Sequence, residues 1–280
     1  MTNEHFRNGI AVVTGAGSGL GASMVDRFAG EGMSIVALDI DEKRVEQKAA
    51  SVREAGGQAI AMRVDVANRS SLEAAAHAAE KAFGGCTVLC ANVGVQQFGA
   101  IDRLTEQDWR WVLDVNVLGV VNTVNAFLPL LRQRSGNRHI LVTASSSVLD
   151  PGVRLGAYIA SKFAVTGYGE TLRQELEPEG IGVSILFPAG MMTRHLESSV
   201  LARPAELGPS ERRPDDIAAM KASRKMDSKA HVVTAEHATR NLLVELAANE
   251  RYIITHGQYR DSIVDRFEDL LRAHDRAQSD

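Results

Sequence analysis

The stretch Ile10-Ala11-Val12-Val13-Thr14-Gly15-Ala16-Gly17-Ser18-Gly19-Leu20-Gly21 places a short apolar run directly before a glycine-rich turn. The residues that follow, Leu20 to Glu31, have a helical pattern that stops at Gly32. Glycine permits a tight turn and a close approach of the backbone to a ligand, and a helix start offers free N–H groups to an anion. Strand, turn and helix in this order predict a phosphate cradle. The residues of the cradle are Gly15, Gly17, Ser18, Gly19, Leu20 and Gly21.

Apolar runs alternate with helical patterns along the rest of the chain. Further strands are predicted at 34–38, 59–64, 88–91, 139–143, 183–187 and 252–255, and further helices at 41–54, 68–83 and 157–177. Several of the strands are apolar on both faces, as expected when helices cover both sides of a sheet. This alternation predicts an α/β protein with a single-domain Rossmann-type doubly wound parallel sheet of about seven strands and helices on both faces.

One stretch breaks the alternation. Residues 191–230 contain Pro204, Pro209 and Pro214 and a run of mixed charges, Glu211 to Asp216. A long irregular connection within a compact domain suggests a functional lid or a disordered segment. We therefore expect one domain over 1–280, with a substrate lid inserted at 191–230 and a helical tail at 257–280.

Composition restricts the kinds of partner. The chain has 280 residues, of which 45% are hydrophobic and 24% charged, and its net charge of −4 argues against nucleic acid as a partner. The N-terminus has no apolar core of a signal peptide, and the apolar stretch Val112 to Leu131 is interrupted by polar residues, so we expect no membrane span. Cys86 and Cys90 are expected to be buried and reduced. These features lead us to expect a cytoplasmic protein.

An acidic residue ends the second strand, 18 positions after Gly21 (39 − 21). Asp39 at this place can bind both hydroxyls of an adenosine ribose and repels a 2′-phosphate, which favours NAD over NADP. Its other interpretation, as the cap of the following helix, suits Asp41 better. Asp65 closes the third strand, and with Val66 beside it we assign it to the adenine edge. Capping of the next helix is the alternative for Asp65.

Tyr158 and Lys162 are four positions apart on a predicted helix, so they share one face. A phenol has an ordinary pKa near 10, and a neighbouring ammonium together with an oxidised nicotinamide ring would lower that pKa. Ser145 follows the fifth strand, 13 positions before the tyrosine (158 − 145), and can hold a substrate oxygen while the phenol exchanges a proton. Ser146 is a rival for this role. The predicted chemistry is hydride transfer to or from a carbonyl carbon.

Together these motifs resemble the short-chain dehydrogenase/reductase family, from about Gly9 to Thr193 and again near Tyr252. The resemblance implies Tyr158 as acid/base, Lys162 as ribose anchor and modulator of the phenol pKa, Ser145 as the substrate-orienting residue, and Asn116 as the holder of a proton-relay water. Two motifs depart from the family pattern. The family's Asn-Asn-Ala-Gly reads Ala91-Asn92-Val93-Gly94, and its Pro-Gly-x-x-x-Thr reads Pro188-Ala189-Gly190-Met191-Met192-Thr193. The cofactor contacts that it implies here are Asn92, Gly94, Pro188, Gly190, Met191 and Thr193, besides Tyr158 and Lys162.

The expected substrate pocket is mostly apolar and rich in methionine, which suits a bulky hydrophobic or aromatic alcohol or ketone. Its candidate lining residues are Gln96, Phe98, Ser147, Leu149 and Met192. The C-terminal third is also similar to bacterial Cα-dehydrogenases that oxidise benzylic alcohols of lignin-type aryl ethers, through Arg203–Gly208, Tyr252–His256 and the tail Tyr259–His274.

These observations predict an NAD-dependent dehydrogenase of a secondary alcohol, working in either direction on a small molecule. The alternatives are an NADP-dependent carbonyl reductase, a cofactor-binding protein without turnover, and an epimerase or dehydratase of nucleotide sugars. We expect no metal, because no His, Cys and Glu set has ligand spacing. The family resemblance implies a homodimer or homotetramer, with helices near Trp109–Leu131 and Ala157–Glu177 at the interface.

Overall fold

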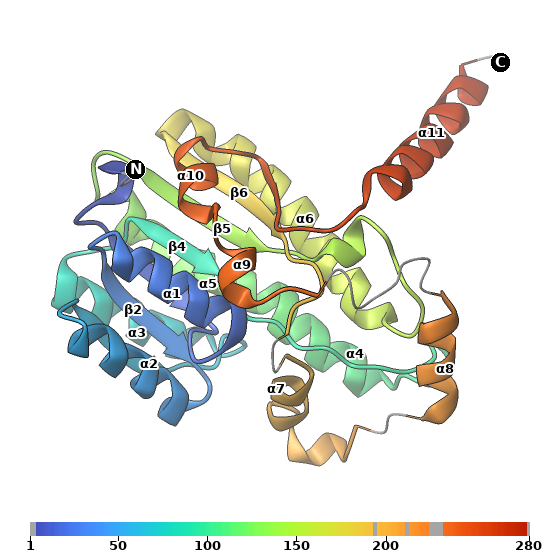
Figure 1. Cartoon of the computed structure of the whole chain (residues 1–280), viewed down its shortest axis with the longest axis horizontal. Coiled ribbons are helices and arrows are strands. Elements are labelled where there is room, and N and C mark those ends of the chain that lie inside the picture. The colour runs from blue at the N-terminus through green and yellow to red at the C-terminus, as the bar shows by residue number, and fades with distance from the viewer. Residues whose placement is uncertain (1–3, 193–194, 211–212, 224–231, 279–280) are drawn as a thin grey trace.

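A computed structural model describes residues 4–192, 195–210, 213–223 and 232–278. Its centre is a sheet of seven parallel strands in the order β3-β2-β1-β4-β5-β6-β7 (Figure 1). The strands are β1 (Ile10–Thr14), β2 (Ser34–Asp39), β3 (Ala59–Arg63), β4 (Val88–Ala91), β5 (Arg138–Thr143), β6 (Ile181–Phe187) and β7 (Tyr252–Ile254). The order reverses between β1 and β4, which is where open sheets of this kind bind ligands.

Helices cover both faces of the sheet, as predicted. The main helices are α1 (Gly19–Gly30), α2 (Glu42–Glu54), α3 (Arg69–Phe83), α4 (Glu106–Leu113), α5 (Gly119–Arg132), α6 (Gly156–Leu176), α7 (His195–Leu201), α8 (Pro214–Ser223), α9 (Ala235–Ala238), α10 (Leu242–Ala247) and α11 (Arg260–Ala277). Short 3₁₀ turns lie at Glu4–Phe6, Ser146–Val148, Glu177–Glu179 and Ala205–Leu207, and a π-helical turn lies at Asp114–Leu118.

The core consists of two layers, one on each side of the sheet. Alternate residues of a strand point to opposite faces. Val12 of β1 therefore packs with α3, α5 and α6, whereas Val13 packs with α1, α2 and α10. This division explains why the central strands are apolar throughout, and it confirms the predicted doubly wound sheet.

The stretch 191–230 was expected to be an irregular connection, and that expectation is wrong for its described part. It contains α7, the turn Ala205–Leu207 and α8. Pro214 is the first residue of α8, and Asp215 and Asp216 lie in its first turn. Proline and acidic residues are favourable at a helix start, so the proline and part of the charge run mark a helix rather than a loop.

The tail helix α11 extends away from the body of the molecule and has no buried residue (Figure 1). Its contacts with the body include a bond from Arg266 to the carbonyl oxygen of Val148, and Arg266 also stacks over the ring of Phe163. The continuous helical run Glu106–Arg132 is long and apolar enough for a membrane span by length and composition, but 44% of its most apolar window is buried inside the molecule.

Candidate active site

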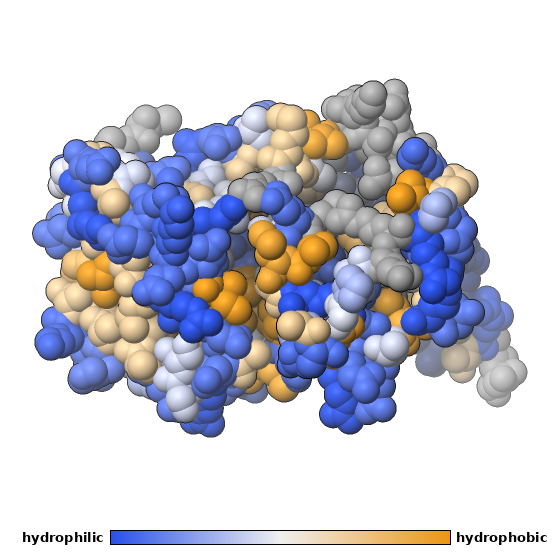
Figure 2. All heavy atoms as spheres, turned by 90° about the horizontal axis from the view of Figure 1, so that it is seen from below, coloured by the Kyte–Doolittle hydropathy of each residue, from blue (hydrophilic) through white to orange (hydrophobic). Residues whose placement is uncertain are grey.

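A cleft of about 1220 Å³ opens at the carboxyl ends of the strands, beside the point where the strand order reverses. It is lined by the glycine turn, the ends of β2, β4, β5 and β6, the Tyr158/Lys162 face of α6 and part of α7. Figure 2 shows a hollow near the middle of one face of the molecule, with strongly hydrophobic side chains beside it. The glycine turn near the N-terminus and the Tyr158/Lys162 pair of α6 thus line the same cleft.

The glycine turn has the shape that a phosphate cradle requires. Gly15 and Gly19 have positive φ angles of 70° and 53°, and a Cβ atom on Gly21 would lie 2.1 Å from the carbonyl oxygen of Gly15. Ser18 caps α1 in extended conformation, and its side chain makes no capping bond. The first N–H groups of α1 therefore face the cleft without a side-chain cap, which fits the pyrophosphate of a dinucleotide.

Asp39 lies at the cleft end of β2, as the sequence analysis predicts. Its carboxylate accepts bonds from the backbone N–H of Gly17 at 2.9 Å and of Asp41 at 3.0 Å. Burial raises the pKa of Asp39, and the backbone bonds from Asp41 and Gly17 oppose this rise. Asp41 caps α2 by accepting from the N–H of Arg44 at 3.1 Å, so the alternative role considered for Asp39 belongs to Asp41.

Two cations near Asp39, Arg44 and Arg63, are not predicted by the sequence motifs. Arg44 lines the cleft and pairs with Asp41 at 2.9 Å. Arg63 also lines the cleft and is opposite Asp39 in the register of β2 and β3. Both bear on the choice between NAD and NADP, since either could meet a 2′-phosphate.

Asp65 and Val66 also line the cleft. Asp65 accepts a bond from the N–H of Ala67 at 3.0 Å, whereas the cap of α3 is Asn68, which accepts from Ser71 at 3.3 Å. The alternative of Asp65 as helix cap is therefore wrong. Val66 is buried, and its carbonyl oxygen accepts from Asn122.

Asn92 lines the cleft and connects the ends of β1, β4 and β5. Its amide nitrogen donates to the carbonyl oxygen of Thr14 at 3.1 Å, and its amide oxygen accepts from the hydroxyl of Thr143 at 3.2 Å. Both ends of the side chain thus join β4 to β1 and β5, and the amide nitrogen lies beside the glycine turn. Gly94 approaches Lys162 so closely that a Cβ atom there would be 3.1 Å from Nζ.

Ser145, Tyr158 and Lys162 meet at the centre of the cleft, and each is at most 8% exposed. The Lys162 ammonium donates to the carbonyl oxygen of Thr143 at 3.0 Å and lies 5.7 Å from the centre of the Tyr158 ring. The side chains of Ser145 and Gln96 lie beside the Tyr158 hydroxyl and act to lower its pKa. Ser147 donates its own hydroxyl to that of Ser145 at 3.0 Å.

Burial dominates the acid–base properties of Tyr158 and Lys162 in the protein alone. Burial raises the pKa of Tyr158, and the bonds to Ser145 and Gln96 only partly oppose the rise. Burial also lowers the pKa of Lys162 to about 8. Removal from water penalises the charged form of each group. The expected lowering of the phenol pKa, which includes the charge of an oxidised nicotinamide, stays a prediction.

Asn116 lies in the π-helical turn and is fully buried. Its amide oxygen accepts from the N–H of Val95 at 2.7 Å, and its nitrogen donates to the carbonyl oxygen of Val95 and to the hydroxyl of Ser161, both at 2.9 Å. Both side-chain N–H donors are thus used within the protein, so the side chain cannot donate to a relay water as well. Asn116 therefore joins the loop after β4 to α6, at Ser161, the residue before Lys162.

The segment after β6 forms the far side of the cofactor cleft. Pro188, Gly190 and Met191 line it. The carbonyl oxygen of Pro188 accepts from the N–H of Ser146 at 2.9 Å, and that of Gly190 contacts Nε2 of His256 at 2.9 Å. Thr193, which the family resemblance implies as a cofactor contact, lies outside the described residues. Within the part of the chain that is described, no group of three or more His, Cys, Asp or Glu side chains could hold a metal ion.

A short chain dehydrogenase family model matches residues 9–203, well over half of the chain. The chain belongs to the short-chain dehydrogenase family. It is 29% identical to a C alpha-dehydrogenase of Sphingobium sp. (strain NBRC 103272 / SYK-6), over 96% of this chain and 87% of the relative. It is also 33% identical to the 2,5-dichloro-2,5-cyclohexadiene-1,4-diol dehydrogenase LinX of Sphingobium indicum, over 66% of this chain and 73% of the relative.

A solved structure of a short-chain dehydrogenase from Burkholderia phymatum, in complex with NAD, superimposes with a TM-score of 0.86. The two are 32% identical, and the match covers 96% of each chain. The chain therefore has the fold of a relative that was solved in complex with NAD.

Three of the five predicted substrate residues line the cleft: Gln96, Phe98 and Ser147. Leu149 is absent from the lining. It follows the 3₁₀ turn Ser146–Val148 and packs against the core. Met192 is also absent and is 67% exposed, since Met191 takes the inward position in a short pairing with Val233. The assignment of these two residues to the pocket is wrong.

A histidine that the sequence analysis does not predict lies beside the phenol of Tyr158. His195, at the start of α7, lines the cleft, and its ring centre lies 6.3 Å from that of Tyr158. Burial, together with the charge of Lys162, lowers the pKa of His195 to about 4. The imidazole is neutral near pH 7 and can exchange hydrogen bonds with a substrate. No spacing in the sequence connects it with Tyr158.

Proposed function

We propose that this protein oxidises a secondary alcohol to a ketone, or reduces the ketone, with NAD as cofactor. The observation that carries the proposal is the convergence of Ser145, Tyr158 and Lys162 beside a glycine turn shaped for a pyrophosphate. A general acid/base must lie within hydrogen-bond reach of the proton it moves, and Tyr158 opens onto the same cleft as the turn.

The side chains can divide the work as follows. Ser145 holds the substrate oxygen, Tyr158 accepts the hydroxyl proton, and Lys162 supplies positive charge beside the phenol. When bound, the oxidised nicotinamide supplies the acceptor for the hydride. Ser147 orients the Ser145 hydroxyl, because it donates to the Ser145 oxygen through both its N–H at 3.1 Å and its hydroxyl.

The choice of NAD rests on Asp39. Its carboxylate is fixed at the cleft end of β2 by Gly17 and Asp41, where a second negative charge on a ribose would be repelled. The solved relative that contains NAD supports the same choice. Arg44 and Arg63 support the alternative, an NADP-dependent carbonyl reductase.

The substrate that we propose is hydrophobic or aromatic, and a benzylic alcohol of a lignin-type aryl ether is the specific candidate. We call the part of the cleft that is lined by Trp111, Val115 and Leu207 its inner end. These three side chains belong to one apolar cluster, so the inner end is apolar. The likeness to the C alpha-dehydrogenase, which spans 96% of this chain, favours the benzylic class.

The first experiment follows NADH formation with NAD or NADP and three alcohols: 1-phenylethanol, 2-phenoxy-1-phenylethanol and 2-butanol. We expect turnover with NAD that is fastest on the benzylic alcohols. Tyr158→Phe, which removes only the hydroxyl, should lower kcat/KM by about 100-fold or more. Turnover on 2-butanol alone would reject the benzylic class. If NAD binds but none of the alcohols reacts, the result favours a cofactor-binding protein without turnover.

A further inference from the structure

The segment that covers the inner end of the cleft is held in place by buried polar contacts. We call residues 195–210, which contain α7 and the turn Ala205–Leu207, the wall segment. Ala202 and Leu207 of the wall segment pack against a cluster that contains Trp111 of α4. Leu201, Ala202 and Leu207 also line the cleft. The wall segment thus sets how much room a substrate has beyond Tyr158.

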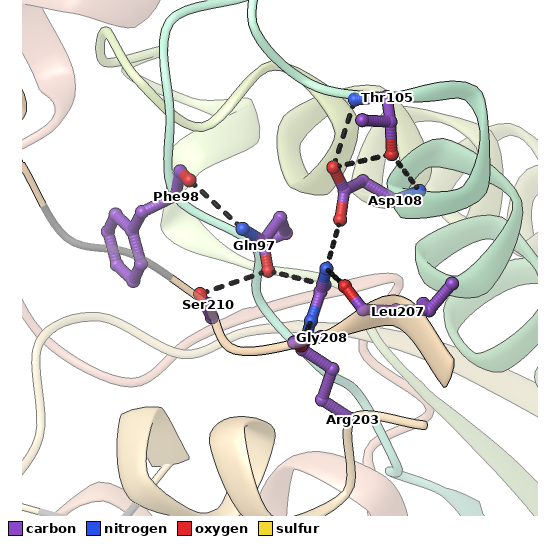
Figure 3. A network of polar contacts seen from close by, with 8 residues as sticks. All are labelled: Gln97, Phe98, Thr105, Asp108, Arg203, Leu207, Gly208 and Ser210. Carbon is purple, nitrogen blue, oxygen red and sulfur yellow. Dashed lines mark hydrogen bonds and ion pairs between the residues drawn. The ribbon is translucent and has the colours of Figure 1, made fainter. Parts of the chain in front are cut away.

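Arg203 is the centre of these contacts. Its side chain is 8% exposed and forms an ion pair of 2.7 Å with Asp108 of α4, which is equally buried (Figure 3). The guanidinium also donates to Oε1 of Gln97 at 3.0 Å and to the carbonyl oxygens of Leu207 at 3.0 Å and Gly208 at 2.8 Å. It lies 5.5 Å from the centre of the Trp111 ring. One side chain therefore joins the wall segment, α4 and the loop after β4.

The Asp108 side chain is also held by contacts within its own helix start, independently of Arg203. It forms a capping box with Thr105, whose N–H and hydroxyl donate to the Asp108 carboxylate at 2.9 and 2.8 Å. The pKa of Asp108 is lowered: burial would raise it, but the bonds from Thr105 and Arg203 together outweigh burial. The carboxylate is therefore a rigid, ionised partner for the guanidinium at neutral pH.

The contacts of the wall segment reach the phenol through the loop after β4. The N–H of Gln96 donates to the hydroxyl of Ser199 at 3.0 Å, and Ser199 is 2% exposed. The next residue, Gln97, accepts from Arg203 and from the hydroxyl of Ser210 at 3.2 Å (Figure 3). Because Gln96 and His195 both lie beside Tyr158, movement of the wall segment would move two of the polar groups around the phenol.

A second group of ion pairs holds α8, which follows the wall segment. Asp216 is 3% exposed and pairs with Arg103 at 2.9 Å and Arg154 at 3.1 Å. These pairs connect α8 to the loops before α4 and before α6. Both groups form within the protein alone, so substrate is not needed to bring the wall segment to α4.

We propose that Arg203 is a positioning residue that presets the inner end of the substrate pocket, and through it the selectivity for an alcohol with a bulky second group. The inference rests on the proposed function for its substrate. Its structural part, the fixing of the wall segment and of the loop after β4 by one guanidinium, is independent of the substrate. A lysine cannot replace it fully, because an ammonium has three donors where the guanidinium offers a planar fork of five.

The test compares the wild type with Arg203→Met, Arg203→Lys and Asp108→Asn. The matched control is Arg132→Met, which removes an exposed ion pair with Glu179. KM and kcat are measured with 2-phenoxy-1-phenylethanol and with 1-phenylethanol, and the Kd for NAD by fluorescence titration. Backbone hydrogen exchange is followed by mass spectrometry in peptides that cover 95–98 and 195–210.

We expect Arg203→Met to raise KM for the larger alcohol by about tenfold or more, with a much smaller effect on the smaller alcohol. The Kd for NAD should change by less than about twofold, since the contacts of Arg203 lie outside the glycine turn. Both sets of peptides should exchange faster. Arg203→Lys and Asp108→Asn should give smaller changes of the same kind, and Arg132→Met none.

Equal losses for both alcohols together with weaker NAD binding would mean a general structural role and would overturn the proposal. Unchanged exchange in every Arg203 and Asp108 variant would overturn it as well. Should Arg203→Met fail to fold, Arg203→Lys and Asp108→Asn give the same comparison. If the wild type oxidises no alcohol, the proposed function fails, whereas the exchange measurements still decide whether Arg203 fixes the wall segment.

Discussion

At the scale of single residues, the centre of the cleft combines a buried phenol with a buried ammonium. Burial raises the pKa of Tyr158 and lowers that of Lys162 to about 8, so the protein alone favours the neutral form of each more than water does. The phenolate that oxidation requires must therefore gain its stabilisation when the cleft is filled. The spacing of Tyr158 and Lys162 identified the pair, but the size of the opposing burial effects depends on residues distant in sequence.

The preference between NAD and NADP is a second property of single residues. Removing the charge of Asp39 by Asp39→Asn or Asp39→Ala should shift the ratio of kcat/KM for NAD and NADP toward NADP by about tenfold or more, because two charges ~4 Å apart repel by up to ~4 kcal/mol at an effective dielectric constant of 20. Arg44 and Arg63 remain in the cleft to meet a 2′-phosphate. Steady-state kinetics with both cofactors measures the ratio.

Asp39→Asn separates charge from hydrogen bonding in this test, since its amide oxygen can still accept from the N–H of Gly17. An unchanged ratio in both variants would show that Asp39 does not select the cofactor. A loss of activity with both cofactors in Asp39→Ala alone would indicate that the carboxylate mainly fixes the glycine turn.

At the scale of structural elements, α1 provides a direct test of the cofactor cradle. A Cβ atom on Gly21 would lie 2.1 Å from a backbone oxygen, whereas one on Gly30 would meet no atom within 4 Å. We expect Gly21→Ala to weaken NAD binding by at least about tenfold, since the turn must open to admit the methyl group. Gly30→Ala should keep the Kd and match or raise the melting temperature, because alanine favours helix by about 1 kcal/mol.

Isothermal titration with NAD and thermal unfolding measure the two effects in the same samples. Normal NAD affinity in Gly21→Ala would contradict the assignment of the turn to the pyrophosphate. Lowered stability in Gly30→Ala would show that the added methyl group collides with a neighbouring group at this end of α1.

The strands and the helices of the sheet layers could be predicted from the sequence to within a few residues, because apolar runs and glycine stops are local signals. The strands predicted at 10–14 and 88–91 match β1 and β4, and the helix predicted at 157–177 matches α6 within one residue at each end. The wall segment and α8 could not be predicted in this way. Their positions depend on ion pairs such as that between Arg203 and Asp108, which are 95 residues apart (203 − 108). The spacing of apolar residues along the sequence does not predict such a contact.

In the candidate site, too, residues with a local sequence signal could be predicted, whereas residues placed by long-range packing could not. Ser145, Tyr158, Lys162 and the glycine turn have fixed spacings, so they were identified. His195 was missed, and Leu149 and Met192 were misplaced, because their orientation depends on how turns pack on the core. The roles of Asn92 and Asn116 also required the structure, since their amides bind backbone and hydroxyl groups of neighbouring elements.

At the scale of the whole molecule, a buried histidine makes stability depend on pH. His139 of β5 is 3% exposed and contacts the Ser184 hydroxyl at 2.9 Å, and burial lowers its pKa from 6.5 to about 3. Between these values the unfolded chain binds a proton that the folded protein does not. The free energy of unfolding is therefore unaffected by His139 above pH 6.5 and falls as the pH drops toward 3, by up to about 1.4 kcal/mol per pH unit.

Urea unfolding at pH 7 and pH 5 measures this effect. His139→Gln, which keeps a neutral polar group, should lose less stability between the two pH values than the wild type. The control His77→Gln changes an exposed residue of α3 and should follow the wild type. Equal losses in wild type and His139→Gln would show that other groups cause the acid sensitivity.

The strand order also determines when, during synthesis, the cleft can form. β1 is made early, but its neighbour β4 follows only after β2 and β3, and Ile10 and Thr87, which bond to each other, are 77 positions apart. Thr143, which holds the amide of Asn92, and Lys162 come later still. A ribosome-bound chain that ends before residue 143 thus carries the complete glycine turn but lacks these supports. Capture of a dinucleotide by nascent chains of increasing length would then report the moment at which the two halves of the sheet join.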